Sequence, residues 1–555
     1  TEDIPDYTAK ASPPCRGSYA TQDGGYIGLV TRHDDTHKIH TALATQSGET
    51  ISEAFARQTT DHVTGMLERC KVPYVSLATA FDVFKLKTKT STSTSPPANS
   101  MPFVEWHASD LPAVSLPPMH FSSSRLHGPR RRAPTKGAHT HMVKEHGWSR
   151  IDSSAQLPRC AHDATYDTGH APLSGVTVVE WSDPTAGVAV TAATLALQDV
   201  GAHVVAVDNG TTRPNVPGFD ALNTSGGGRE TIPLRELERY LVSAHVLVTN
   251  VSVSTLQTHV GHMDTHNRYL RDFPRLIVCR VPYFPDRNTP PSHETETKTP
   301  SHHAVEGAHL ARHEIAAFWQ KSGLAHALAG PNAPPPDMPP HFGELMTSIF
   351  VTSSVAIALF HQRRTGEGQV VEVPMNRVAI WCNNQANAIL TRDHSLSTMF
   401  LIPRNKFHKR FPIPTANSFQ TRDGMWVQLL GVELPRHLHK TAKCLRVSPR
   451  VYLKVLKAVA TQVVPNRSAA TFLERLFPVF ETINTEFEAA FKRRDWADLH
   501  AAFIKNDVWH CPVRTPREAA KFRQFAACGA FYMREGVVQR IASPADYSTW
   551  PCGAY

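Results

Sequence analysis

The chain has 555 residues, of which 41% are hydrophobic and 19% charged, and 58 Lys and Arg outnumber 49 Asp and Glu, which gives a net charge of +9. This length exceeds what one simple hydrophobic core supports and predicts two or more domains. The moderate basic excess fits either an ordinary basic enzyme or a subunit packed near nucleic acid, and it excludes a histone-like tail protein.

The nine cysteines are scattered singly along the chain. No CxxC pair or other ligand spacing occurs, so neither a disulfide framework nor a zinc site is predicted. We therefore expect reduced, packed thiols, a reducing compartment and no metal.

No uninterrupted apolar segment is long enough to cross a membrane. The nearest, Leu345 to Phe360, is interrupted by five Ser and Thr residues, and this predicts a buried helix. The first residues show neither the apolar region of a signal peptide nor an Arg-rich amphipathic helix.

Residues 1–170 predict a largely irregular, low-complexity and basic extension. Ile51 to Lys71 has the spacing of one amphipathic helix, whereas residues 85–100 and 122–136 contain too few apolar side chains to order themselves. The second stretch contains a compact basic cluster, for which both contact with phosphates or an acidic partner and a solvated linker stay open. The cluster consists of Arg125, Arg130, Arg131, Arg132 and Lys136.

The pattern changes near Ala171, where short apolar runs begin to alternate with helical segments. This alternation predicts a parallel, Rossmann-like sheet covered on both faces. Predicted strands are residues 177–181, 203–207, 245–248 and 275–279, and predicted helices between them are 186–198 and 234–242. A further helix (345–363), a Gly366/Gly368 turn, a strand (370–373) and a helix (377–390) follow, and then a hairpin turn at 421–424 with a strand at 425–429.

The segment Phe342-Gly343-Glu344, followed by a helix and Arg364-Thr365-Gly366-Glu367-Gly368-Gln369, resembles the active-site segment of the family III CoA-transferases. That family includes formyl-CoA transferase, carnitine CoA-transferase and α-methylacyl-CoA racemase. Weaker landmarks in the same order extend the resemblance over residues 172–547. They are Pro172 to Val176, His313 to Leu324, Asn417 to Phe419 and Cys511 to Val513.

The resemblance implies an α/β fold, with a Rossmann-like parallel sheet domain, a smaller α+β domain and an interlocked dimer. The implied domains are an extension at 1–170, a large domain at 171–400, a small domain at 401–520 and a return to the large domain or a C-terminal tail at 521–555. Residues 1–170 have no counterpart in the family.

The resemblance also assigns roles to individual residues. Glu344 stands where the family has its Asp nucleophile or base, and His313 with Glu314 stands where the racemase branch has a His and a neighbouring Asp. A carboxylate suits CoA transfer because it forms a reactive anhydride with the acyl group. The extra carbon of Glu moves the carboxylate by about 1.5 Å. For His313, an ordinary core or surface histidine is the competing interpretation, because the chain has 31 His.

The residues that would contact CoA are Asn223, Arg229 and Gly343. Around them the family pattern has changed: Asp183 precedes a helix start that would face the nucleotide, and a Pro- and His-rich insertion follows Cys279. A carboxylate at a helix N-terminus competes with an anionic ligand. These changes favour loss of catalysis.

The sequence therefore predicts a catalytically degenerate CoA-transferase III fold that serves as a structural subunit of a large assembly. A mitochondrial matrix ribonucleoprotein such as the ribosome is the expected assembly, with a homodimer or paralogous heterodimer, other protein subunits as partners, and rRNA contact through the basic cluster. No cofactor is required, and CoA or acyl-CoA binds if the ancestral site is intact. The alternative is an active CoA-transferase or acyl-CoA racemase that uses Glu344.

Overall fold

The structure is a computed structural model that describes about half of the chain. The described residues are 16–30, 36–76, 120–121, 171–208, 230–284, 313–383, 413–515, 518, 523 and 531–541, except for 47–48, 71, 73, 184–186, 262–269, 329–334, 432, 449, 451–452, 454–468 and 535–536. The chain forms two compact units. One comprises residues 1–89, 320–338 and 385–531, and the other comprises 90–319, 339–384 and 532–555.

The second unit is built on a seven-stranded sheet with the order β4-β10-β9-β8-β5-β6-β7. Six of its strands are parallel, and β4 pairs antiparallel with β10 at one edge. The strands are β4 (His120–Phe121), β5 (Thr177–Trp181), β6 (His203–Asp208), β7 (Glu230–Pro233), β8 (Val246–Thr249), β9 (Ile277–Arg280) and β10 (Val370–Glu372). The predicted Rossmann-like parallel sheet is confirmed.

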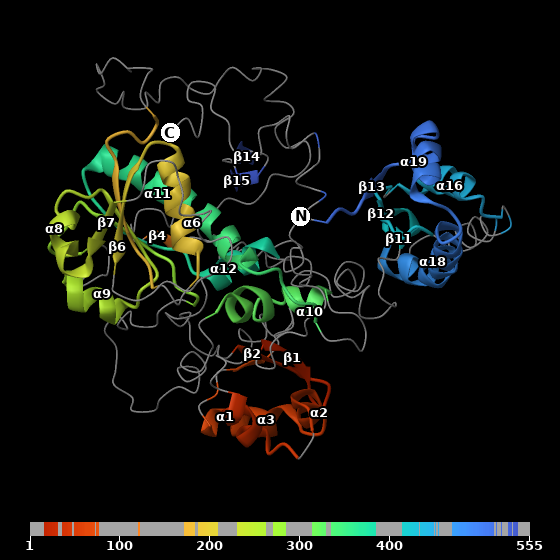
Figure 1. Cartoon of the computed structure of the whole chain (residues 1–555), viewed down its shortest axis with the longest axis horizontal. Helices are drawn as coiled ribbons and strands as arrows, with labels where there is room; N and C mark the ends of the chain where they lie inside the picture. Colours follow the sequence, from red (N-terminus) through yellow and green to blue (C-terminus); the bar gives the residue numbers. More distant parts are fainter. Residues whose placement is uncertain are drawn as a thin grey trace, which may run out of the picture. The chain divides into compact units, whose positions relative to one another are not determined.

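Helices cover both faces of this sheet (Figure 1). The helices α8 (Leu237–Leu241) and α9 (Val253–Val260) lie on one face, where Leu237 and Leu256 join Val179 in a buried cluster. The helices α6 (Ala189–Asp199), α11 (Phe342–Thr365) and α12 (Met375–Cys382) lie on the other. The strands β8 and β9 are buried at every position, which explains their continuous apolar runs.

Helix α11 contains the motif segment and packs against α6 and β9. Within the described residues it is the single helix long and apolar enough to span a membrane, and 50% of its apolar window is buried inside the protein. It ends at Gly366, whose φ of 75° is the left-handed conformation that glycine adopts at little cost. A side chain at Gly368 would collide with the backbone of Arg275 and Leu276. The predicted helix and glycine turn are confirmed.

A small α+β domain occupies the C-terminal part of the first unit. Its antiparallel sheet has the order β11-β12-β13, with β11 (Ser418–Gln420), β12 (Trp426–Leu429) and β13 (His510–Pro512). The helices α16 (Leu434–Leu445), α18 (Ala469–Phe491) and α19 (Trp496–Lys505) complete it. Stacked Phe419 and Phe491 lie at the centre of its core. The smaller α+β domain expected from the sequence is thus present.

Residues 16–76 also form a folded α/β element, so the expectation of a largely irregular extension is wrong for this range. A hairpin of β1 (Arg16–Ala20) and β2 (Tyr26–Val30) pairs with β3 (Tyr74–Ser76), and α1 (Thr36–Leu43) precedes two more helices. The hairpin turn is stabilised by Asp23, which accepts hydrogen bonds from Thr21 and Thr60. The Asp-Gly dipeptide at 23–24 is the turn signal that predicts this hairpin.

The single helix predicted over Ile51 to Lys71 is also wrong, because two helices form there. They are α2 (Ile51–Ala56) and α3 (Thr60–Arg69), and Thr59 is the N-cap of the second. The break is stabilised by Gln58, whose buried side chain donates to the carbonyls of Leu43 and Ala54. The low-complexity stretches 85–100 and 122–136, with the basic cluster, lie outside the described residues.

The remaining described elements are short. The π-helix η5 (Ile315–Gln320) and α10 (Leu324–Leu328) precede α11, and β14 (Phe531–Arg534) pairs with β15 (Val537–Ile541). The 3-10 turns η3 (Leu234–Glu236) and η6 (Pro414–Ala416) precede α8 and β11. A π-helix is an uncommon element that occurs often at functional sites, and η5 begins directly after a site residue described below.

Candidate functional site

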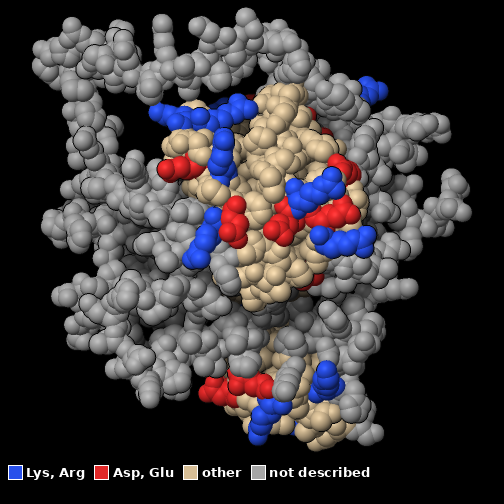
Figure 2. All heavy atoms as spheres, turned by 90° about the vertical axis from the view of Figure 1, so that its left-hand side faces the viewer, with Lys and Arg blue, Asp and Glu red and all other residues tan. Residues whose placement is uncertain are grey.

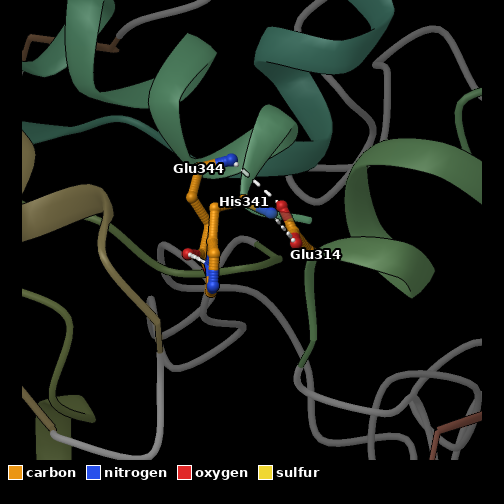
Figure 3. A group of neighbouring side chains, drawn as sticks. All are labelled: Glu314, His341 and Glu344. Carbon is orange, nitrogen blue, oxygen red and sulfur yellow. Dashed lines mark hydrogen bonds and ion pairs between the residues drawn. The ribbon is translucent and has the colours of Figure 1, made fainter. Parts of the chain in front are cut away.

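Three ionisable side chains, Glu314, His341 and Glu344, converge at the start of α11 (Figure 3). Glu314 immediately precedes η5, His341 is the N-cap residue of α11, and Glu344 is the third residue of that helix. One nitrogen or oxygen atom from each lies within 4.8 Å of those of the other two. All three belong to the unit that contains the parallel sheet.

Glu314 caps the N-terminus of α11. Its Oε1 accepts a hydrogen bond from the backbone N–H of His341 at 2.7 Å, and its Oε2 accepts one from the backbone N–H of Glu344 at 3.3 Å. The first N–H groups of a helix have no partner within the helix, and their dipoles favour a negative charge. The Glu314 residue is 3% exposed, so its side chain caps this helix end from a buried position.

Glu344 points away from its own helix to the start of α6. Its Oε2 accepts hydrogen bonds from the backbone N–H of Val188, the N-cap of α6, at 2.7 Å and from Nδ1 of His341 at 2.9 Å. The Tyr283 side chain also hydrogen-bonds to Glu344. Gly187 provides the space for this arrangement, since a Cβ there would lie 1.6 Å from Oε1 of Glu344.

His341 adopts a left-handed backbone conformation with a φ of 62°. Residues other than Gly adopt it uncommonly, although His, Asn and Asp do so more often than the rest, and it costs roughly 1–3 kcal/mol. The backbone N–H of His341 contacts Glu314 while its ring contacts Glu344, so the conformation places one residue between the two carboxylates. The His341 side chain is 34% exposed and that of Glu344 is 4% exposed.

The two carboxylates influence each other and a neighbouring phenol. Burial, and secondly the nearby Glu344 charge, raise the pKa of Glu314 to about 7, although the N–H groups of α11 act in the opposite direction. Burial and the charges of Glu344, Glu314 and Asp183 raise the pKa of Tyr283 well above its usual value of 10, so this phenol keeps its proton. The site thus holds a carboxyl group that exchanges a proton near neutral pH.

Comparison with known proteins identifies the group to which this site belongs. The model of "CoA-transferase family III" matches residues 234–554, which include Glu314, His341 and Glu344. The chain belongs to CoA-transferase family III. A search of curated proteins finds no match.

Solved structures similar to the chain include two bacterial proteins. Rv3272 from M. tuberculosis is 19% identical, with a TM-score of 0.47 and coverage of 69% of this chain and 95% of that one. A CAIB/BAIF family protein from Brucella suis is 18% identical, with a TM-score of 0.46 and coverage of 68% of this chain and 93% of that one.

The structure brings together some of the site residues that were predicted from the family's sequence landmarks. Glu314 and Glu344 meet as described, whereas Nδ1 of His313 accepts a hydrogen bond from the N–H of Ile315 and lies outside the group of three. Gly343 packs against Phe318, where a Cβ would lie 2.6 Å from the ring. The predicted CoA contacts Asn223 and Arg229 lie outside the described residues.

The sequence analysis missed His341 and Tyr283. His341 stands three residues before Glu344, and this is the spacing of a helix N-cap and the acidic residue that reaches back to it. That spacing is the signal that identifies His341. Tyr283 follows β9 at the carboxyl edge of the parallel sheet, which is the usual location of ligand sites in this class of fold.

The ligand atoms of the three residues have the spacing of a small divalent cation site. The N–H groups of α11 point at Glu314, and the N–H of Val188 points at Glu344. A cation would therefore compete with the positive ends of two helices. The arrangement suits proton exchange better than metal binding.

Proposed function

We propose that the chain retains the fold and the acidic site of CoA-transferase family III but not covalent CoA turnover, and that it serves as a structural subunit. The observation that carries this proposal is the position of the Glu344 carboxylate, which is turned inward to the N-terminus of α6. We call this position retracted. Glu344 is 3% exposed and hydrogen-bonded to Val188, His341 and Tyr283.

Retraction opposes catalysis in two ways. A carboxylate that attacks a thioester must place an oxygen roughly 3–3.5 Å from the carbonyl carbon, whereas Glu344 is buried and its Oε1 packs against Gly187. The N-terminus of α6 is also a natural site for an anionic ligand such as a phosphate, and the Glu344 carboxylate already accepts its N–H. The residue at the nucleophile position thus fills space that a substrate would need.

The proposed assembly is a large ribonucleoprotein of the mitochondrial matrix, of the ribosome type. The net charge of +9 and the basic cluster at 125–136 support it. In Figure 2, positive and negative side chains are interspersed over the described part of the visible face, without a field of one sign. The RNA contact is assigned to the basic cluster on its sequence.

A homodimer or paralogous heterodimer within this assembly is supported by exposed apolar side chains on α11. Ile349 is 55% exposed, Ile357 49% and Phe360 61%. Large apolar groups exposed along one helix favour contact with another subunit.

The loss of turnover is tested by trapping. The purified full chain is incubated with acyl-CoA thioesters of several chain lengths and then with hydroxylamine, which converts an enzyme-bound acyl anhydride or thioester into a hydroxamate. We expect no modification at Glu344 by peptide mass spectrometry. A hydroxamate on Glu344, absent in Glu344→Gln, would overturn the proposal.

The structural role is tested by co-sedimentation from a gentle mitochondrial lysate. We expect the chain to sediment with an RNA-containing particle and to be released at high salt, and we expect replacement of the basic cluster by Ser to weaken the association. Substitution is preferable to truncation, because β4 at residues 120–121 is part of the sheet. A chain found only as a free dimer would contradict this role.

The second candidate is an active CoA-transferase or acyl-CoA racemase, and the pKa of about 7 at Glu314 favours it. A group with this pKa exchanges protons efficiently at neutral pH, as a general acid or base requires. In transfer, an oxygen of Glu344 would form a bond to the thioester carbonyl carbon, and CoA would leave as its thiolate with the electrons of the C–S bond. The trapping experiment separates the proposal from the transferase. A racemase forms no covalent adduct, and exchange of the acyl α-hydrogen for solvent deuterium detects it.

A further inference from the structure

We propose that His341 is a positioning residue whose contact, added to those of Val188 and Tyr283, is needed to keep the Glu344 carboxylate retracted. This inference rests on the retracted state invoked in the proposed function. It assigns that state to a residue outside the family's sequence landmarks.

The first argument is the placement of His341 between two fixed groups. Its backbone N–H is 2.7 Å from Oε1 of Glu314, and its Nδ1 is 2.9 Å from Oε2 of Glu344. A contact of this length between a ring nitrogen and a carboxylate oxygen is attractive only when Nδ1 carries a proton. Protonated at Nδ1, His341 donates to Glu344 while Glu314 holds its backbone.

The second argument is the strained conformation of His341. A left-handed histidine at a helix N-cap lacks the side-chain capping bond that usually stabilises this position, and none is made here. The ring instead reaches Glu344. An ordinary N-cap residue in the β region would direct its side chain to the helix backbone, so the strain is coupled to the contact with Glu344.

The third argument is the solvent exposure of His341 compared with that of the two glutamates. The side chain of His341 is 34% exposed, whereas Glu344 at 4% and the whole Glu314 residue at 3% are buried. The remaining partners of Glu344 are the backbone N–H of the buried Val188 and the side chain of Tyr283, which is partly exposed like His341. The imidazole is therefore a contact of Glu344 that reaches the protein surface.

The variants follow from the backbone conformation. His341→Gly keeps the left-handed conformation and the N–H to Glu314 but removes the ring, and His341→Asn keeps both and retains an amide donor for Glu344. His341→Asp also tolerates this conformation but repels the carboxylate. The Gly and Asn variants form a matched pair that differs in the side-chain hydrogen bond from residue 341 to Glu344.

The probe is a water-soluble carbodiimide with glycine methyl ester, read by peptide mass spectrometry on the folded full chain. The carbodiimide activates a carboxyl oxygen, and the amine then displaces the urea and leaves an amide on the protein. Glu433, with a side chain that is 68% exposed, and Glu180, which is 1% exposed, serve as internal controls for open and closed carboxylates. Circular dichroism checks that each variant is folded.

We expect Glu344 to be labelled as little as Glu180 in the unmodified chain and in His341→Asn. Labelling should rise at least tenfold, towards that of Glu433, in His341→Gly. If the Gly variant does not fold, His341→Asp should show the same increase.

Equal labelling of Glu344 in the unmodified chain and the folded Gly or Asp variant would overturn the inference. So would labelling of the Asn variant as strong as that of the Gly variant, because the hydrogen bond would then have no role. Either result leaves the proposed loss of turnover in place. A trapped acyl adduct on the unmodified chain contradicts the proposed function and does not change the labelling comparison.

Discussion

Two buried glutamates contact the same helix, α6, and they are held in different ways. Glu180 on β5 accepts hydrogen bonds from the hydroxyls of Thr191 and Thr194, each at 2.6 Å, and is 1% exposed. These hydroxyls lie three residues apart on one face of the helix. Glu344 contacts the N-terminus of α6 through Val188 and is 3% exposed.

The difference lies in the partners. Neutral hydroxyls on a regular helix hold Glu180, whereas Glu344 shares its surroundings with a second carboxylate, an imidazole and a phenol that come from separate loops. Groups whose protonation changes near neutral pH gather at functional sites. Equal burial therefore describes a packing carboxylate in one case and a member of an ionisable cluster in the other.

The largest expected effect is at the packing carboxylate. Glu180→Ala removes the acceptor of two buried hydroxyls and leaves a cavity, so we expect the free energy of unfolding to fall by about 3–5 kcal/mol. Glu180→Gln, which keeps the volume and one acceptor, should lose about 1–2 kcal/mol. Urea denaturation measures both. A loss below about 1 kcal/mol in the Ala variant would remove the contrast with Glu344.

The next effect is a pH dependence of stability that arises from the group of Glu314, His341 and Glu344. The pKa of Glu314 is raised from its ordinary 4.5 to about 7 in the folded chain. Between these values the folded state binds a proton that the unfolded state has lost, so this group stabilises the fold below pH 4.5 and loses that contribution as the pH rises to 7. The loss is about 3 kcal/mol over the window.

This pH dependence is measured as the difference in unfolding free energy between the unmodified chain and Glu314→Gln, by urea titration at several pH values. The Gln side chain cannot ionise, so the difference should change across the window and be constant above it. Parallel curves for the two proteins would show that Glu314 has an ordinary pKa, as a packing carboxylate without charged neighbours would have.

A smaller effect is expected where Gly187 makes room for Glu344. Gly187→Ala places a methyl group against the carboxylate at a φ of 82°, and we expect it to cost about 2 kcal/mol. Glu344→Ala should relieve the collision, which gives a coupling of about 1 kcal/mol in a double-mutant cycle. Strict additivity would mean that Glu344 does not occupy this space.

The smallest effect is expected at one of the two hydroxyls that contact Glu180. Thr194→Val keeps the shape and removes one donor, and we expect a loss of about 1 kcal/mol in thermal or urea unfolding. The same substitution at Thr352, whose hydroxyl contacts helix backbone carbonyls, is the control and should cost less. Equal losses at both positions would show that Glu180 adds nothing to an ordinary hydroxyl contact.

The sheet was predictable from the sequence because its strands are buried on both faces. β8 and β9 therefore appear as continuous apolar runs, and glycine is required where α11 turns into β10. The fold of residues 16–76 was not predicted, because its strands are short and its helices are interrupted at Gln58. That break is stabilised by a hydrogen bond from Gln58 to Leu43, in the preceding helix, which the local sequence does not encode.

Part of the site was also predictable from the sequence. Glu344 follows a glycine in a family motif, and Glu314 lies in a second landmark, so their positions could be read from order and spacing. That Glu344 turns to α6 depends on the left-handed His341, the space at Gly187 and a loop that brings Tyr283 close. These are properties of three-dimensional packing between segments distant in sequence.

The strand β4 has a consequence for the order in which the protein folds. His120 and Phe121 pair with Glu372 and Val371 of β10, and most of the sheet's sequence separates these partners. During synthesis the edge partner is made first but must wait for the last parallel strand before it can pair. Such non-local contacts form late and slowly. Until then, β10 would present an open edge to other chains, and a nascent-chain chaperone would have its greatest effect in this interval.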